Sequence, residues 1–157
     1  MKDYIALWLE GLPGRLEELP GLRSKALDLS VSVTGIYDRH LGPTWPYAAI
    51  TLRVEPASSF EVVNDIPEDE EFQKEGYLDW AIFGLLDVLM FVEGSPMHEI
   101  RVTLEGAEYS RVDSSQMAFH QAGRDAGRRV IESLMEKRRL AMRDRPEIKA
   151  TTVRLSK

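Results

Sequence analysis

Apolar and polar residues alternate in three stretches of this chain, 27–33, 48–54 and 98–104. An alternation of period two is typical of a strand that buries one face. In the second stretch, for example, Ala48, Ile50, Leu52 and Val54 share one face. We therefore predict strands over Leu27–Val33, Ala48–Val54 and His98–Leu104, and a last strand over Lys149–Leu155.

Two longer stretches carry apolar residues at helical spacing. In the first, Phe72–Phe91, the inward positions are Leu78, Ile82, Leu85, Leu86 and Leu89. The acidic run Pro67–Glu71 suits a helix start, because it lies at the positive end of the helix dipole. Gly94 and Pro96 are expected to end this helix.

The second predicted helix begins near Ser114 and extends to Arg143, ahead of Pro146. Its inner stripe starts with small residues and then widens; the stripe consists of Ala118, Ala122, Ala126, Val130, Ile131 and Leu134. Asp113 is expected to be the N-cap, with Gln116 reaching back as in a capping box. Small side chains would let this helix lie close to a sheet.

The elements thus follow the order β-β-α-β-α-β. The arrangement that buries all the apolar stripes is a single two-layer α+β domain, with a mixed sheet and two α-helices on one face. The other face of the sheet would be exposed to solvent or used for contact. A chain of 157 residues with 43% hydrophobic and 29% charged residues suits one folded domain of this kind.

The charge is unevenly distributed along the chain. The net charge is −6, but residues 55–110 hold fourteen acids and two bases, whereas residues 111–157 hold twelve bases and six acids. Only the last third could therefore present a basic face. Arg124, Arg128 and Arg129 in the second helix either contact phosphate or form ion pairs with the acidic middle of the chain.

Several classes of chemistry have no sequence signal here. The chain has no cysteine, no Gly-x-x-x-x-Gly-Lys-[Ser/Thr] loop for a nucleotide phosphate, and three scattered histidines without metal-ligand spacing. We expect no catalytic site, no cofactor, no metal and no nucleotide. No signal peptide or apolar stretch of membrane-spanning length is visible, so we expect a cytoplasmic protein without a membrane partner.

Several motifs resemble domain IV of elongation factor G, the ribosomal translocase. They are Tyr47–Pro56, ending in Glu-Pro; Phe60–Ile66; and the continuous run from Gly94 through Tyr109-Ser110-Arg111-Val112-Asp113 to Phe119. The resemblance covers residues 27–137. It implies a domain IV-like domain over 26–157, with the fold of the C-terminal domain of small-subunit ribosomal protein five, and an N-terminal extension over 1–25. The GTPase domain of the translocase is absent.

In that family, two loops at the tip of the domain contact messenger and transfer RNA. Here the corresponding loops are Gly42–Tyr47 and Gly106–Arg111. Both depart from the family pattern. Gly42 and Tyr47 alone remain of Gly-Gly-Arg-Gly-Gln-Tyr, Ser110 replaces the tip histidine, and Arg111 stands where an acid is usual.

The candidate contact residues are therefore Trp45, Tyr47, Tyr109, Ser110, Arg111, Arg124, Arg128 and Arg129. Trp45 and Tyr47 would stack on unpaired bases, anchor a protein interface or pack against the sheet edge. The resemblance implies a non-catalytic protein that binds ribosomal RNA, the ribosome or another translation component. The alternative is a module for protein interaction or self-association, such as a homodimer, unrelated to translation.

Overall fold

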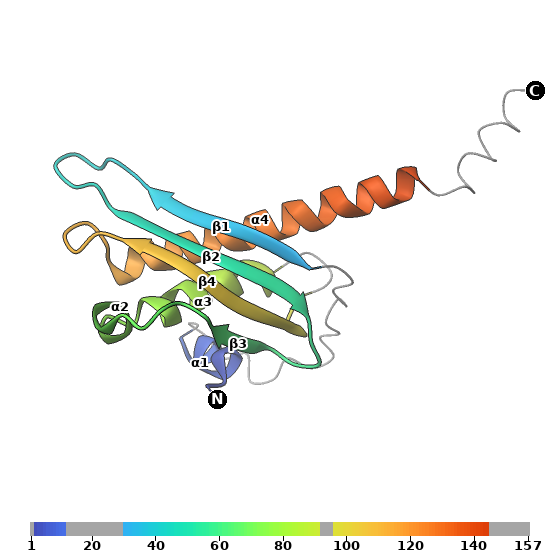
Figure 1. The fold of residues 1–157 in the computed structure, drawn as a ribbon, viewed down its shortest axis with the longest axis horizontal. Coiled ribbons are helices and arrows are strands. Elements are labelled where there is room, and N and C mark those ends of the chain that lie inside the picture. Colours follow the sequence, from blue (N-terminus) through green and yellow to red (C-terminus); the bar gives the residue numbers. More distant parts are fainter. Residues whose placement is uncertain (1, 12–29, 92–95, 145–157) are drawn as a thin grey trace, which may run out of the picture.

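The computed structural model describes residues 2–11, 30–91 and 96–144, and Figure 1 shows the arrangement of their elements. The elements in chain order are α1 (Tyr4–Glu10), β1 (Val31–Asp38), β2 (Tyr47–Pro56), β3 (Glu61–Asn64), α2 (Glu70–Lys74), α3 (Tyr77–Leu89), β4 (Ile100–Tyr109) and α4 (Gln116–Arg143). The expected strand over 149–155 and the expected helix stop at Gly94 lie outside the described residues.

The four strands form one mixed sheet in the order β1-β2-β4-β3. β1 pairs with β2 and β2 with β4 in antiparallel fashion, whereas β3 runs parallel to β4. The predicted α+β class, mixed sheet and one-sided helix layer are confirmed. β3 was not predicted, because its four residues alternate too briefly to give a signal of their own.

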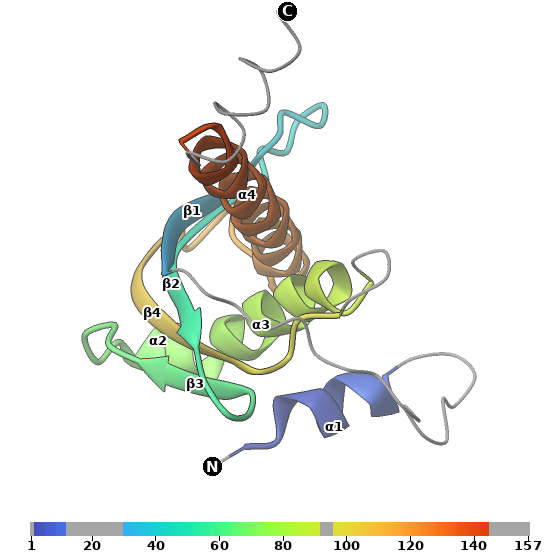
Figure 2. The same cartoon turned by 90° about the vertical axis from the view of Figure 1, so that its right-hand side faces the viewer.

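The helices α3 and α4 cover one face of the sheet (Figure 2), and glycines let them approach closely. A Cβ atom on Gly84 would lie 1.9 Å from the carbonyl oxygen of His120, and one on Gly123 would lie 1.9 Å from that of Ala81. Gly35 lets β1 approach α4 in the same way, because a Cβ atom added at Gly35 would lie 2.2 Å from the Ala122 carbonyl oxygen. The predicted alanine stripe of α4 is buried at this contact.

The single helix predicted over Phe72–Phe91 is wrong in one respect, because it is broken at Gly76. This glycine has a φ of 68°, in the left-handed region that favours glycine, and it precedes the first residue of α3. The break leaves α2 as a short separate helix capped by Asp69, whose side chain accepts from the Phe72 N–H. Of the predicted apolar stripe of α3, Ile82, Leu85, Leu86 and Leu89 are buried, and Leu78 is half-buried.

The predicted N-cap of α4 is also wrong. Ser115, not Asp113, caps the helix, and its hydroxyl accepts a hydrogen bond of 3.1 Å from the Ala118 N–H. Asp113 lies in the preceding loop and accepts from the Ser110 hydroxyl. Gln116 donates to the Glu75 carbonyl oxygen instead of reaching back to the cap. Both Asp and Ser favour an N-cap, so local propensity could not separate these neighbouring positions.

The N-terminal helix α1 joins the helix layer by packing on α3. Its residues Tyr4 and Trp8 are 7% and 6% exposed and belong to the main hydrophobic core. The Tyr4 hydroxyl donates to Asp79 and the Trp8 Nε1–H donates to Asp87, both on α3. Burial, followed by the hydrogen bond to Asp79, raises the pKa of Tyr4. The described part of the expected extension is thus integrated into the core.

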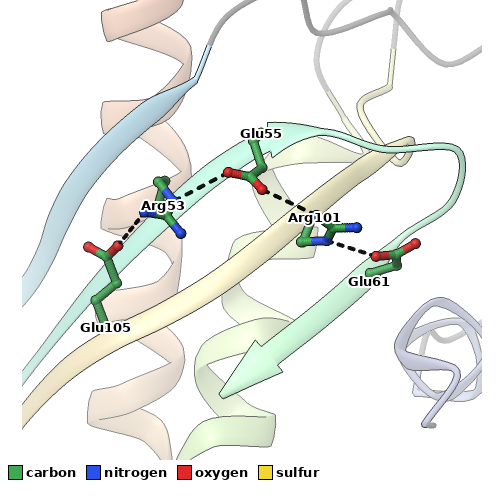
Figure 3. A network of polar contacts seen from close by, with 5 residues as sticks. All are labelled: Arg53, Glu55, Glu61, Arg101 and Glu105. Carbon is green, nitrogen blue, oxygen red and sulfur yellow. Dashed lines mark hydrogen bonds and ion pairs between the residues drawn. The ribbon is translucent and has the colours of Figure 1, made fainter. Parts of the chain in front are cut away.

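The opposite face of the sheet carries a row of paired charges (Figure 3). Arg101 on β4 bonds Glu55 on β2 at 3.3 Å and Glu61 on β3 at 2.9 Å, and Arg53 bridges Glu55 and Glu105. Hydrogen bonds to Glu61 and Glu55 raise the pKa of Arg101. Each arginine thus lies between two carboxylates, which leaves this row with a net negative charge and makes it a poor surface for RNA phosphates.

Candidate macromolecule-binding site

The predicted loop Gly106–Arg111 is wrong in its bounds, because β4 continues to Tyr109 and the loop that follows covers residues 110–115. This loop and the one between β1 and β2 lie at the same end of the molecule (Figure 1). The β1–β2 loop, residues 39–46, is closed by a hydrogen bond from the Arg39 N–H to the Pro46 carbonyl oxygen. The β4–α4 loop, residues 110–115, is tied to the start of β2, because Ser114 Oγ donates to the Tyr47 carbonyl oxygen at 2.6 Å and the Tyr47 N–H donates to the Asp113 carbonyl oxygen at 3.2 Å. The fold therefore brings the two loops together.

The β1–β2 loop presents a half-exposed tryptophan. Trp45 is 55% exposed, its Nε1–H donates to the Asp38 carboxylate, and its ring lies 5.0 Å from the ring of His40. The tight turn before it depends on Gly42, which has a φ of 61°. The indole is thus held in place while more than half of its surface remains available for contact.

The β4–α4 loop is instead cross-linked by its own side chains. Ser114 Oγ accepts from the Ser110 N–H at 2.8 Å, and the Ser110 hydroxyl donates to Asp113 and accepts from the backbone. Arg111 is exposed, but its guanidinium forms a 2.8 Å ion pair with Glu71 on α2. Ser110 therefore has a structural role in the loop, and the charge of Arg111 is already balanced.

The two candidate tyrosines are likewise engaged within the fold. The Tyr109 hydroxyl donates to Asp69 at 2.7 Å, and this hydrogen bond raises the pKa of Tyr109 to about 12 and lowers that of Asp69. The ring of Tyr109 packs near Phe72. The Tyr47 hydroxyl donates to Glu108 at 2.8 Å, which raises the Tyr47 pKa. Tyr47 and Tyr109 are both half-buried, whereas more than half of Trp45 is exposed.

The three predicted arginines of α4 have different surroundings. Arg129 pairs with Asp125 at 2.8 Å, and Asp125 also accepts from the Ile36 N–H of the edge strand β1. Arg124 is partly buried, and its Nε has no hydrogen-bond partner. Arg128 is exposed and forms no ion pair with the described residues, so its charge is available to a ligand.

Arg39 was not among the expected contact residues, and it completes this surface. It lies with Arg128 around a shallow polar depression between the end of β1 and α4, which Gln121 also lines. Its guanidinium lies 5.8 Å from the centre of the Tyr37 ring and has no carboxylate partner among the described residues. The nearby carboxylate of Asp38 accepts from the indole N–H of Trp45, which is neutral, so Asp38 keeps its negative charge in this depression. A base between two predicted strands was the available signal, but only the fold places it beside α4.

We call the set Arg39, Trp45 and Arg128 the hairpin site.

Within the residues that the structure describes, no group of three His, Cys, Asp or Glu side chains is placed to hold a metal ion. Among the helices over the same residues, none combines the length and the apolar character that a membrane crossing requires.

No known family model matches this chain. A crystal structure of the protein ttk003000868 from Thermus thermophilus is similar to it, with a TM-score of 0.56 and 24% sequence identity. The match covers 64% of this chain but 15% of that protein, which is therefore much the longer of the two. This likeness concerns the fold, since identity at this level carries no function with it.

Proposed function

We propose that this chain is a non-catalytic relative of domain IV of elongation factor G that binds RNA of the ribosome, or another RNA-containing translation component, through the hairpin site. The resemblance of residues 27–137 to that domain and the observed α+β fold support the kinship.

The observation that carries the proposal is the combination of two unpaired arginines with an exposed tryptophan at one end of the sheet. Arg39 and Arg128 form no ion pair with the described residues. Of the two acids that line the same depression, Asp125 is paired with Arg129, whereas Asp38 accepts from the neutral indole of Trp45 and keeps its negative charge. Arginine guanidinium groups suit phosphate oxygens, and an exposed indole stacks on unpaired bases for about 1–3 kcal/mol per base. The hairpin site therefore offers both contacts that RNA requires.

The structure also argues against the other tip loop as the main RNA contact. Arg111 lines a depression with one other base, Lys74, and with four carboxylates on α2 or next to it, which are Asp69, Glu70, Glu71 and Glu75. Such a negative surface repels phosphate, and the arginine within it is already paired. We therefore expect charge reversal to change RNA affinity differently in the two loops.

The test is cosedimentation with ribosomes and fluorescence binding to single-stranded RNA. The double variant R39E/R128E should lose binding by about a hundred-fold, since each reversal removes one phosphate contact and adds a repulsive charge. R111E is the matched control and should bind within about two-fold of wild type. Equal binding by wild type and R39E/R128E, or loss of binding in R111E alone, would contradict the proposal.

A second candidate function, protein interaction or self-association, rests on a different surface. The C-terminal half of α4 projects past the sheet (Figure 1) and exposes Met135, Leu140 and Met142, which are 66%, 48% and 56% exposed. Exposed apolar residues grouped on one element often mark a protein contact. A concentration-dependent dimer by light scattering that is lost in M135E/M142E would support it, and a monomer at all concentrations would remove its self-association form.

A further inference from the structure

A second hollow lies on the helix layer, lined by α1, α3 and α4 and with no residue in common with the hairpin site. It measures about 350 Å³ and is lined by Leu7, Trp8, Trp80, Phe83, Asp87 and His120 together with a glycine of the α1 terminus. This volume is within the range of small-ligand sites. We call this set of residues the aromatic hollow.

The rings of the aromatic hollow stand almost at right angles to one another. Trp80 meets Phe83 at an interplanar angle of 81° with 6.0 Å between ring centres, and it meets His120 at 79° with 6.1 Å. Trp8 lines the hollow from α1. These are edge-to-face contacts between neighbouring rings, and the same three rings line the hollow together with Trp8.

One carboxylate, Asp87, also lines the hollow. Its two oxygens accept from Trp8 Nε1–H at 2.7 Å and from His120 Nε2 at 2.8 Å. Both contacts fix its position. Among the described residues that line the hollow, Asp87 is the one carboxylate, and there is no lysine or arginine.

We propose that the aromatic hollow binds an organic cation of the methylated ammonium class, either a small quaternary ammonium compound or a methylated lysine side chain. The faces of Trp and Phe rings attract a cation through their quadrupoles, and the carboxylate of Asp87 adds a direct charge interaction. Methyl groups suit the apolar part of the wall, which Leu7 and Phe83 form. They also weaken the hydration of the cation, so the cation loses less hydration free energy when it enters the hollow. This proposal does not depend on RNA binding.

A bare metal ion fits the hollow less well. Apart from the imidazole of His120, the walls offer apolar rings and a leucine, and both oxygens of the single carboxylate are already hydrogen-bonded. A divalent cation needs several oxygen or nitrogen ligands at once. The chemistry of the lining therefore favours a diffuse, weakly hydrated cation.

The test is calorimetric titration of the full chain with choline, with trimethyllysine and with 3,3-dimethylbutan-1-ol, the neutral isostere of choline. The cations should bind about ten-fold more tightly than the neutral alcohol, because shape and apolar area are matched and only the charge differs. Equal affinity for choline and the alcohol would overturn the proposal, as would absence of binding by both cations at millimolar concentration.

Two tryptophan variants place the binding in the molecule. Trp80 is 39% exposed, so W80L should keep the fold, verified by circular dichroism, and should lose cation affinity about ten-fold. W45L in the hairpin site is the matched control and should bind the cation as wild type does. Cation affinity that falls in W45L and persists in W80L would contradict the assignment to the aromatic hollow. RNA binding in the same variants should show the reverse pattern, so the two proposals fail separately.

Discussion

The β1–β2 loop and the β4–α4 loop lie at the same end of the molecule, yet they differ in how their side chains are used. In the β4–α4 loop, Ser110, Asp113 and Ser114 bond one another or the start of β2, and Arg111 pairs with Glu71. In the β1–β2 loop, Trp45 is more than half exposed and Arg39 has no carboxylate partner among the described residues.

This difference shows that the residue type alone does not identify a contact residue. Arg111 and Arg128 are both exposed arginines, but Arg111 is paired with Glu71 beside the acidic helix α2, whereas Arg128 lines a depression and forms no ion pair with the described residues. Carboxylates next to an arginine repel the phosphates that the arginine would otherwise bind. The neighbours that the fold supplies therefore separate a structural loop from a candidate binding loop.

The largest effect is expected from removing the hydroxyl that ties the β4–α4 loop to β2. In S114A, the Ser110 N–H and the Tyr47 carbonyl oxygen lose their partner, which should lower the free energy of unfolding by about 2 kcal/mol. Urea denaturation measures this change. The matched variant T44A, which removes an exposed hydroxyl from the β1–β2 loop, should cost below about 0.5 kcal/mol. Equal losses in the two variants would mean that both loops are equally cross-linked.

Salt should affect RNA binding through the β1–β2 side only. For two phosphate contacts to single-stranded RNA, the slope of log K against log salt concentration should be about −1.4, which is about a seven-fold loss between roughly 50 and 200 mM salt. R111E should keep this slope, whereas R39E/R128E should flatten it. Fluorescence titration at several salt concentrations measures it, and an equal reduction of the slope in both variants would remove the distinction between the loops.

The Tyr109–Asp69 bond should make the β4–α4 side sensitive to acid. Because the folded state lowers the pKa of Asp69 from its ordinary 3.8, the bond stabilises the protein above that pKa and the stabilisation is lost as pH falls through the lowered value. Y109F should therefore unfold at a lower temperature than wild type at pH 7, and the difference should shrink towards pH 3. A difference that is constant from pH 7 to pH 3 would show that Asp69 is not the partner that matters.

The smallest effect is expected from freeing Arg111. E71Q removes the carboxylate that pairs with Arg111 at 2.8 Å and one negative charge from α2. RNA affinity should rise about two-fold, because the loop then has one available positive charge at an exposed position. Fluorescence titration measures this, with E136Q on the distant part of α4 as control. A decrease in affinity would show that Glu71 positions Arg111 for binding instead of neutralising it.

The helices α3 and α4 and the strands β2 and β4 followed in outline from local patterns. β1 continues to Asp38, past the predicted end at Val33, and β4 continues to Tyr109, past the predicted end at Leu104. The alanine stripe of α4 predicted its buried face, and the alternation of Ala48, Ile50, Leu52 and Val54 predicted the inner face of β2. Three further features differ from the predictions. β3 was not predicted, the cap of α4 is Ser115 where Asp113 was expected, and α2 and α3 are two helices where one was expected. Each of these errors concerns a short segment or a boundary. There the free-energy difference between the competing local conformations is smaller than the free energy of the contacts with the rest of the fold.

The candidate site was predictable only in part. Trp45 and Arg128 carried a sequence signal and keep their place in the hairpin site, whereas Tyr47, Tyr109, Ser110 and Arg111 are engaged within the fold. Arg39 had no motif around it. Its role depends on its distance from α4, which lies far along the chain from it.

The sequence by itself determined the α+β class and the inward faces of the main helices and strands. The reason is that the spacing of apolar residues within a short segment decides which of its faces is buried. The tertiary structure alone decided which charges are paired, which aromatic rings remain exposed, and that α1 and α4 together line an aromatic hollow. Those properties depend on distances between residues far apart in the chain, and electrostatic and hydrogen-bond energies vary steeply with such distances.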